Sequence, residues 1–323
     1  MNLIVPQTLD GERLDKAIAT LADATRHEVA DAIDRGSVSI AGVVMTKPSR
    51  RVHTDDEIVV EGDLAAPTID LAGDPAVPFR VEFEDDHVIV VDKPADVVVH
   101  PGKGSHTGTL VQGLLARYPD LAALAVGDRA LRPGIVHRID KGTSGLLMVA
   151  RSHAVTDALQ AQLAARTVER RYLALAWGPF ESRAGVIDAA IGRSNADPTK
   201  MTVSAAGRPS VTHYTVEHGF TDPEEVTLVN CELETGRTHQ IRVHLAAIQH
   251  PVVGDPIYGG AKRSLRIGRP FLHAQTLGFV HPVSGELVRF HSPLPDDLLV
   301  VLAGLLPGWP GIDAAAAGQP QMS

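Results

Sequence analysis

The chain has 323 residues and a formal net charge of −9, with 44% hydrophobic and 21% charged residues. This composition is typical of a folded globular protein and excludes a disordered chain. No apolar run approaches the roughly 20 residues of a membrane helix. Residues 1–6 lack the basic start of a signal peptide, and the single Cys231 cannot form an internal disulfide. Both features predict a cytoplasmic protein.

Residues 1–62 are predicted to form a small unit of two helices and short strands. Apolar residues recur at helical spacing from Leu14 to Leu21 and again from Val29 to Ile33, and Gly36 ends the second helix. Short strands are expected at 37–40, 43–44 and 57–60. Residues 63–78 are rich in Pro, Gly and Ala without periodicity, which predicts a linker.

Residues 79–306 are predicted to form a second and larger domain. Strands are expected at 79–83, 87–92, 134–138, 146–151, 171–177, 211–217 and 225–233. Helices are expected at about 108–117, 153–165, 239–248 and 295–305. Because strands and helices mix without strict alternation, the predicted fold class is α+β with a mixed, largely antiparallel sheet. Residues 307–323 are predicted to be a disordered tail.

The negative net charge argues against a nucleic-acid partner, but the charges are unevenly distributed. Residues 128–151 contain five basic residues and two acids, and residues 231–273 contain six basic residues and three acids. Solvated surface faces are the ordinary explanation of such clusters. Because both clusters coincide with Gly-rich polar segments, they indicate a local anion-binding site on an otherwise acidic protein.

The segment 132–151 places an aspartate between two cations. It reads Arg-Pro-Gly-Ile-Val-His-Arg-Ile-Asp-Lys-Gly-Thr-Ser-Gly-Leu-Leu-Met-Val-Ala-Arg. Arg138 and Lys141 flank Asp140 and favour its ionised form, which a nucleophile or a general base requires. A structural salt bridge explains the same pattern without catalysis.

A second polar cluster lies at residues 234–244, with the sequence Glu-Thr-Gly-Arg-Thr-His-Gln-Ile-Arg-Val-His. Arg242 lies between two apolar residues and is a candidate inward-facing cation, although an amphipathic helix whose arginine reaches solvent has the same pattern. His239 and His244 do not have the i, i+4 spacing of a helical zinc pair. We therefore expect no metal site.

Together these segments resemble the RluA/RluD-type RNA pseudouridine synthases. The resemblance spans nearly all of residues 79–305 and follows the motif order of the family. It rests on Asp92-Lys93-Pro94, Val99-His100-Pro101-Gly102, the Val136–Lys141 and Thr143–Gly145 segments, Arg171-Tyr172-Leu173-Ala174, the Thr235–His244 segment, the Gly254–Gly259 segment and Leu272-His273-Ala274. Several motifs in register are far more specific than one short pattern. The departures are Ile139, where leucine is usual, and Gly142, where an acid is common.

The resemblance implies an isomerase that flips a uridine out of folded RNA and converts it to pseudouridine. It implies that Asp140 is the catalytic carboxylate and that Arg242 is its basic partner. It also implies that Tyr172 packs against the flipped base and that Arg138 fills the gap in the RNA stack. No cofactor, no metal and a monomeric state are expected. The similarity is greatest to the RluD branch, whose members act on large-subunit (23S-type) ribosomal RNA.

The first unit resembles the small RNA-binding module known from a small-subunit ribosomal protein, the S-four type. The resemblance lies in Arg13-Leu14-Asp15, Thr25-Arg26, Asp34-Arg35-Gly36-Ser37-Val38 and Lys47-Pro48-Ser49. It implies that this unit contacts RNA through a basic face made of Arg13, Arg26, Lys47, Arg50 and Arg51. In the second domain, Lys141 and Arg237 are expected to contact RNA as well. Residues 11–62 hold seven basic residues and ten acids, so a protein-contact module is the alternative.

Two other functions stay open at this point. The first is a non-catalytic RNA-binding or ribosome-assembly factor on the same fold. The second is an oxidoreductase that uses the glycine-rich residues 102–108, although their spacing does not match a dinucleotide loop. The pattern also leaves two routes for Asp140, which either attacks the anomeric carbon or removes a sugar proton to give a glycal. It does not identify which uridines are modified.

Overall fold

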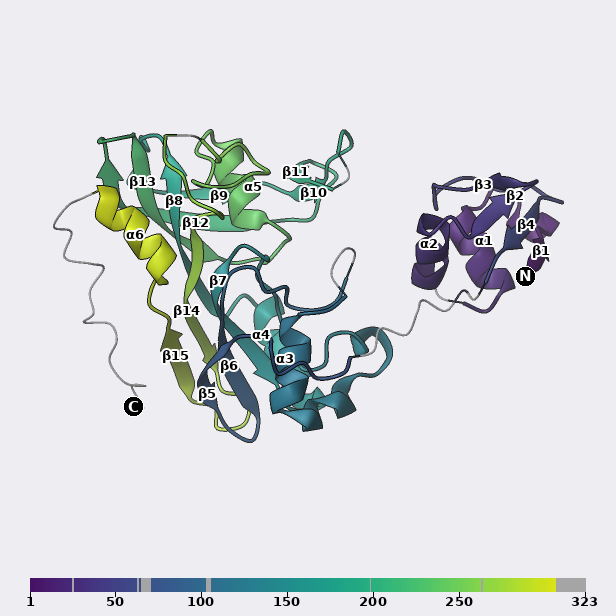
Figure 1. Cartoon of the computed structure of the whole chain (residues 1–323), viewed down its shortest axis with the longest axis horizontal. Coiled ribbons are helices and arrows are strands. Elements are labelled where there is room, and N and C mark those ends of the chain that lie inside the picture. Colours follow the sequence, from purple (N-terminus) through teal and green to yellow (C-terminus); the bar gives the residue numbers. More distant parts are fainter. Residues whose placement is uncertain are drawn as a thin grey trace. The chain divides into compact units, whose positions relative to one another are not determined.

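The computed structural model describes residues 1–24, 26–62, 64, 71–102, 106–197, 199–262 and 264–305. The chain divides into two compact units, which are Met1–Asp70, here the N-terminal unit, and Leu71–Ser323, here the C-terminal unit (Figure 1). The predicted linker ends earlier than residue 78, because Val77 is buried in the core of the C-terminal unit and Asp74 N donates to Gln112 O at 2.9 Å. The predicted tail, 307–323, lies outside the described residues.

The N-terminal unit packs two helices against a small antiparallel sheet. The sheet has the order β1-β4-β2-β3, with bounds β1 Asn2–Ile4, β4 Glu57–Val60, β2 Val38–Ile40 and β3 Val43–Val44. The helices are α1 Leu14–Leu21 and α2 Arg26–Asp34, and a 3-10 turn, η1, covers Gln7–Leu9. Apolar residues of α1 at helical spacing are buried, as the sequence predicted. Strand β1 was not predicted, and none of its three residues is fully buried.

The C-terminal unit is built on a large sheet with the order β5-β6-β7-β14-β8-β13-β12-β9, in which β15 also pairs with β14 (Figure 1). The strand bounds are β5 Arg80–Glu84, β6 Val88–Lys93, β7 Ser144–Ala150, β8 Glu169–Trp177, β9 Ala184–Asp188, β12 Val211–Phe220, β13 Val226–Leu233, β14 Leu272–Val280 and β15 Leu287–His291. A separate hairpin pairs β10 Ile191–Arg193 with β11 Met201–Val203. Within the described residues the pairing of β7 with β14 is parallel and the other pairs are antiparallel, which confirms the predicted fold class.

The helices of the C-terminal unit are α3 Leu110–Arg117, α4 His153–Ala164, α5 Gln240–Ala247 and α6 Asp296–Leu305, with the 3-10 helices η2 Pro119–Leu124 and η3 Gly127–Arg129. Thr109 and Gln112 form a reciprocal capping box at the start of α3. Ser152 caps α4 by accepting a hydrogen bond from Val155 N. Among the described residues, none of the helices has the length and apolar character needed to span a bilayer.

The strand predicted at residues 134–138 is wrong. In this segment Ile135 forms a single backbone bridge to Val149 of β7. Gly134 lies in a turn, and residues 136–138 belong to neither a strand nor a helix. Gly134 has φ +70°, and a Cβ there would collide with the Ala150 carbonyl oxygen, so the backbone turns where the hydrophobic pattern favours a strand. Strand β14 was not predicted, because buried polar residues such as His273 and Gln275 interrupt its apolar pattern.

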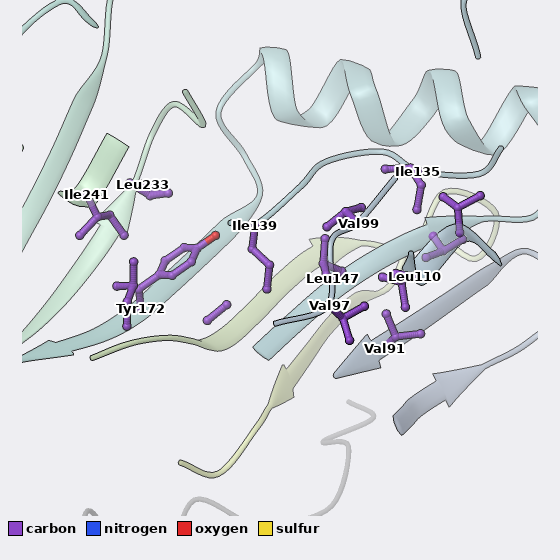
Figure 2. Packing of buried hydrophobic residues seen from close by; sticks show 14 of the residues in the cluster. Val91, Val97, Val99, Leu110, Ile135, Ile139, Leu147, Tyr172, Leu233 and Ile241 are labelled. Carbon is purple, nitrogen blue, oxygen red and sulfur yellow. The ribbon is translucent and has the colours of Figure 1, made fainter. Parts of the chain in front are cut away.

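Two hydrophobic clusters lie against β8 and its neighbours. One cluster contains Tyr172 together with apolar residues of β6, β7, α3 and α5. Figure 2 shows part of it, with Tyr172 between Ile139 and the pair Leu233 and Ile241. The other cluster buries alternate residues of β8, such as Leu173, against α6. Because side chains alternate along a strand, β8 contributes to both clusters and its position is fixed from both sides.

We predict that Gly145→Ala destabilises the protein by about 2 kcal/mol or more. Gly145 has φ +114°, and a Cβ there would collide with the Ala274 carbonyl oxygen of the paired strand β14. Urea denaturation measures the free energy of unfolding. Gly219→Ala in β12 is the control, because its Cβ meets open space and its φ lies outside the left-handed region, so its stability should change by less than about 1 kcal/mol. Equal stabilities of the two variants would contradict the role of Gly145.

Candidate active site

Asp140 lies in the turn that leads into β7. Thr143 N donates to Asp140 O at 3.1 Å and closes this turn. Strand β7 begins at Ser144, whose Oγ lies 2.9 Å from His273 Nδ1 on β14, and both of these residues are buried. The parallel pairing of Ser144 with His273 therefore fixes the place where the turn ends. The Asp140 side chain keeps 15% of its surface exposed, so it is accessible from outside.

A buried lysine supports the same turn. Lys93, at the end of β6, is 0% exposed, and its Nζ donates to Pro94 O at 2.7 Å and to Lys141 O at 3.4 Å. Burial lowers the pKa of Lys93 to about 7, although the negative charge of Asp140 acts in the opposite direction. Lys93 thus fastens the backbone immediately after Asp140 to the end of β6.

Two further donors bind the carbonyl groups of this turn. Asp96 N donates to Lys141 O at 2.8 Å, and Arg269 Nη1 donates to Gly142 O at 3.3 Å. Arg269 is itself held by both carboxylate oxygens of Asp297, at 2.6 and 2.9 Å. Since buried carbonyl groups that have partners resist local unfolding, these contacts keep the backbone around Asp140 in one conformation.

The partner of the Asp140 carboxylate comes from α5. Arg242 Nη1 donates to Asp140 Oδ2 at 3.2 Å. The same guanidinium donates through Nε and Nη2 to the fully buried Asp255, at 2.6 and 2.9 Å. Burial by itself disfavours the charged arginine, but the hydrogen bonds and the charge of Asp255, together with the charge of Asp140, raise the pKa of Arg242. Arg242 is therefore a fixed cation with one nitrogen directed at Asp140.

The ion pair of Asp140 connects residues that are distant in sequence. In the described part of the chain Asp140 pairs with Arg242, 102 residues away, and not with its sequence neighbours Arg138 or Lys141. The Lys141 side chain is exposed, and its carbonyl group serves the turn instead. The sequence indicated that Arg242 faces inward. The ion pair of Asp140 is formed by this residue and not by the two cations that flank Asp140 in sequence.

A small cavity of about 70 Å³ opens above Asp140. Its apolar wall contains Ile139, Tyr172, Leu233, Ile241 and Leu272, and its polar wall contains Arg138, Arg170, Arg237 and His239. The pKa of Tyr172 is raised to about 12, chiefly by burial; the charge of Arg170 opposes this shift and the charge of Asp140 contributes to it. The Tyr172 hydroxyl is therefore protonated at neutral pH. The cavity joins a flat apolar wall to a carboxylate and several cations, which suits a planar polar ring.

Tyr258 and His239 belong to this site; the sequence predicts that His239 forms hydrogen bonds around the site without acting as an acid or a base, and it assigns Tyr258 no role. His239 has φ +58°, and its Nδ1 lies 2.8 Å from the Tyr258 hydroxyl oxygen. The Arg242 guanidinium lies over the Tyr258 ring, 5.2 Å from its centroid. A left-handed histidine just before a helix is the type of strained backbone that surrounding contacts must maintain. The signal was available in the Gly254–Gly259 motif, but only its family resemblance was used.

The expected basic residues of the N-terminal unit lie near one another. Arg13 and Arg26 both bind the Asp15 carboxylate, at 2.9 and 2.8 Å, and Arg13 pairs with Arg51 through a backbone bridge. Leu14 N donates to Arg50 O at 2.7 Å, and Arg50 N donates to Lys47 O, so the segment 47–51 runs beside the start of α1. The group is basic, but Asp15 neutralises part of its charge.

The sequence also raised the questions of a metal site, of the role of Cys231 and of the glycine-rich segment 102–108. Within the described ranges, no three His, Cys, Asp or Glu side chains are grouped so that they could hold a metal ion. Cys231 is buried in β13, and this burial raises the pKa of its thiol to about 12. The glycine-rich segment 102–108 includes residues 103–105, which lie outside the described residues.

Comparisons with known proteins agree on one family. The family model described as RNA pseudouridylate synthase matches residues 87–247, and the S4 domain model matches residues 12–58. The chain is 42% identical to "Ribosomal large subunit pseudouridine synthase D" of Nitrosomonas europaea, over 94% of this chain and 88% of that protein. It is 42% identical to "Uncharacterized RNA pseudouridine synthase YlyB" of Bacillus subtilis, over 91% and 94%. A solved structure, "Human RNA Pseudouridylate Synthase Domain Containing 1", has TM-score 0.55 and 30% identity, over 75% of this chain and 99% of that one.

We predict that the stability conferred by Lys93 depends on pH. Because burial lowers its pKa to about 7 from the ordinary 10.5, the unfolded chain binds more protons than the folded chain between these pH values. The free energy of unfolding therefore gains a contribution that rises as pH increases from about 7. Lys93→Met lacks this contribution, so the stability of the wild type relative to this variant should increase between pH 6 and pH 9 in urea denaturation.

The exposed Lys200→Met is the matched control for Lys93→Met. The difference in stability between the wild type and the Lys200 variant should be the same at every pH. Parallel pH profiles for the wild type and Lys93→Met would contradict the prediction for Lys93.

Proposed function

The chain belongs to the RNA pseudouridylate synthase family, and from this we propose that it converts specific uridines of large-subunit ribosomal RNA to pseudouridine. Support for the substrate comes from relatives named "Ribosomal large subunit pseudouridine synthase D", which are similar to this chain over 94% of its length. The observation that carries the catalytic proposal is the Asp140 carboxylate, held by Arg242 at the mouth of a cavity whose wall includes Tyr172.

The target base has to leave the RNA stack before a carboxylate reaches its sugar, which costs a few kcal/mol. Arg138 lines the cavity, and from there its guanidinium fills the space that the base leaves in the stack. Tyr172 then packs against the flipped base within the apolar wall. Cations around the cavity balance the phosphates of the RNA that follows the base into the site.

Asp140 begins the chemistry as an anion. It either attacks the anomeric carbon of the sugar or removes a sugar proton to give a glycal, and both routes break the bond between N1 of uracil and the sugar. The freed uracil turns within the cavity, and its carbon 5 bonds to the anomeric carbon. This step breaks the ester bond to Asp140 on the first route, and on the glycal route the sugar regains the proton that Asp140 removed. The proton on carbon 5 is then released, and N1 takes up a proton. The protonated Tyr172 hydroxyl is a donor at neutral pH and not a base. Positioning and charge are sufficient for this rearrangement, so we propose no cofactor and no metal.

We further propose that the N-terminal unit binds the same RNA through its basic group, Arg13, Arg26, Lys47, Arg50 and Arg51. The match to the S4 domain supports this role. The ion pairs with Asp15 reduce the charge available to phosphates, so the contact adds to the binding of the C-terminal unit and does not replace it. A monomer in the cytoplasm is the proposed state, which the single buried Cys231 fits.

The rival function is a non-catalytic RNA-binding or ribosome-assembly factor on this fold. The two functions differ in whether the protein itself forms pseudouridine.

We predict that cells without the gene lose pseudouridine at specific large-subunit positions. The wild-type gene should restore this pseudouridine, and the Asp140→Asn gene should not. The asparagine keeps the size of the side chain and loses the charge that either route needs. Release of tritium from carbon 5 of labelled RNA measures the purified proteins. The exposed Asp157→Asn is the matched control and should retain full activity, because Asp157 pairs with Arg129 and does not line the cavity.

Turnover of Asp140→Asn within about tenfold of the wild type would refute the role of Asp140. An unchanged pseudouridine map in cells without the gene would refute the large-subunit substrate and favour the rival.

Removing residues 1–70 is predicted to affect the natural RNA much more than a short one. The C-terminal unit has its own core and should still modify saturating short RNA at the full-length rate. Efficiency on large-subunit RNA should fall by roughly one to three powers of ten, because a tethered second contact is lost. The dependence of efficiency on salt should also become weaker. Thermal unfolding of the truncated protein is the control for folding. Equal efficiency and equal salt dependence would favour the protein-contact alternative.

A further inference from the structure

A second and larger cavity, here the arginine cavity, adjoins the cavity above Asp140. It has a volume of about 570 Å³ and lies between the segment 132–138, the end of α4 and the turn 234–237. Its charged lining consists of Arg132, Arg138, Arg166, Arg170, Arg237 and a single acid, Glu234. A concave site with five arginines and one carboxylate attracts anions.

The Glu234 carboxylate is already paired. One of its oxygens lies 2.6 Å from His213 Nε2, and the other binds Arg166. Hydrogen bonds from His213 and Arg166 lower the pKa of Glu234, so it is an anion at neutral pH and shares its charge with these two residues. Among the described residues that line the arginine cavity, no other acid is present beside Arg138, Arg170 and Arg237.

Arg170 is the least compensated of these cations. Among the described residues three arginines are buried, namely Arg170, Arg242 and Arg269, with 6%, 5% and 6% of their surface exposed. Arg242 and Arg269 each bind both oxygens of an aspartate. Arg170 binds two backbone carbonyl groups through Nη2, those of Leu233 at 3.2 Å and Glu234 at 3.1 Å. Burying a guanidinium without an anion is costly, so the position calls for a negative ligand.

The Arg170 guanidinium lines both cavities and has donors that its two carbonyl partners do not use. Its Nε is buried and has no hydrogen-bond partner. Its Nη1 lies against Gly236, where a Cβ would approach to 2.7 Å, so a glycine at this position lets the guanidinium reach the turn. Arg170 lines the arginine cavity and also the cavity above Asp140, as do Arg138 and Arg237. These three arginines form the boundary between the two cavities.

We infer that the arginine cavity binds a phosphodiester group of the RNA strand immediately beside the flipped uridine, with Arg170 as its central donor. The inference rests on the proposed function, because it assumes that the cavity above Asp140 receives the uridine. The neighbouring linkage of the same strand then has to pass the boundary that Arg138, Arg170 and Arg237 form. A phosphate oxygen accepts charge-assisted hydrogen bonds from guanidinium groups, and it supplies the anion that Arg170 lacks.

This contact has a consequence for catalysis as well as for affinity. A phosphate fixed at the boundary holds the sugar of the flipped nucleotide at a set distance from Asp140, because the linkage and the sugar are covalently joined. Arg170 is therefore a positioning residue. It acts on the reaction through the RNA backbone and does not touch the reacting atoms.

The experiment replaces single phosphates of a short RNA by neutral methylphosphonates, one linkage at a time on each side of the target uridine. Binding affinity and single-turnover rate are measured for the wild type and for Arg170→Gln. One neutral linkage should weaken wild-type binding on the order of 10- to 100-fold. With unmodified RNA, Arg170→Gln should bind more weakly than the wild type by a similar factor. Replacing the contacted phosphate by the neutral linkage should then weaken the binding of Arg170→Gln only slightly further. Its salt slope should fall by about one phosphate contact.

Two further variants keep the test decisive. Gly236→Ala retains the charge of Arg170 but displaces its Nη1, and it should reproduce part of the loss even if Arg170→Gln is unstable in thermal unfolding. Arg289→Gln, an exposed arginine that pairs with Glu169 and does not line the arginine cavity, should respond to every neutral linkage as the wild type does. Inorganic phosphate should compete with RNA for the wild type more strongly than for Arg170→Gln.

The results separate this inference from the proposed function. If the loss of affinity from Arg170→Gln and the loss from each neutral linkage are independent, their factors multiply when the two changes are combined. Arg170 would then contact none of these phosphates, and the inference would be wrong. If inorganic phosphate binds at Arg170 but no neutral linkage matters, the cavity is a site for free anions and the inference is also wrong. A protein that binds RNA with the expected coupling but produces no pseudouridine would retain the phosphate site and refute the proposed function instead.

Discussion

The fully buried carboxylate of Asp255 holds Arg242 through two hydrogen bonds, and this pair determines the geometry of the candidate active site. With two nitrogens bound to Asp255, the guanidinium has one orientation, and its Nη1 reaches Asp140. Removing one partner of such a buried pair typically costs about 3–5 kcal/mol, because a charge is left without compensation. The loop before β7, helix α5 and the turn after it are thereby brought to a common point. Tyr258 packs over the same guanidinium and lies within hydrogen-bond distance of His239, which extends the network to the start of α5.

Buried cations support the backbone on both sides of this site. Lys93 and Arg269 donate to carbonyl groups of the turn that carries Asp140, and Arg170 donates to carbonyl groups at the end of β13. Each is a basic side chain that donates where an uncharged donor could satisfy the carbonyl group, so basic groups gather around the turn of Asp140 and the end of β13. Arg269 has an aspartate partner, whereas Lys93 has a pKa lowered by burial and Arg170 has backbone partners. The scaffold and the anion-binding character of the site therefore have the same physical origin.

The distribution of charge reconciles an acidic protein with an RNA substrate. The net charge of −9 belongs to the whole chain, while five arginines and a single acid line the arginine cavity of the C-terminal unit. In the N-terminal unit, Asp15 binds two of the five basic residues expected to contact RNA. An acidic body with a local basic site disfavours binding to RNA at large and leaves binding to places where strand shape and chemistry match the cavities.

The amino-acid sequence by itself determined the fold class, the family and most of the elements, because apolar periodicity and a series of motifs in register depend on local spacing. It also identified Asp140, Arg242 and Tyr172 as members of one site, which the structure brings together. The tertiary structure decided which cation pairs with Asp140, since Arg138 and Lys141 are neighbours in sequence but Arg242 is the neighbour in space. It decided that residues 134–138 are not a strand and that β14 is one, because a left-handed Gly134 and buried polar residues act against the local pattern. The anchoring by Asp255 and the uncompensated Arg170 follow from burial, and burial depends on contacts between segments that no local pattern contains.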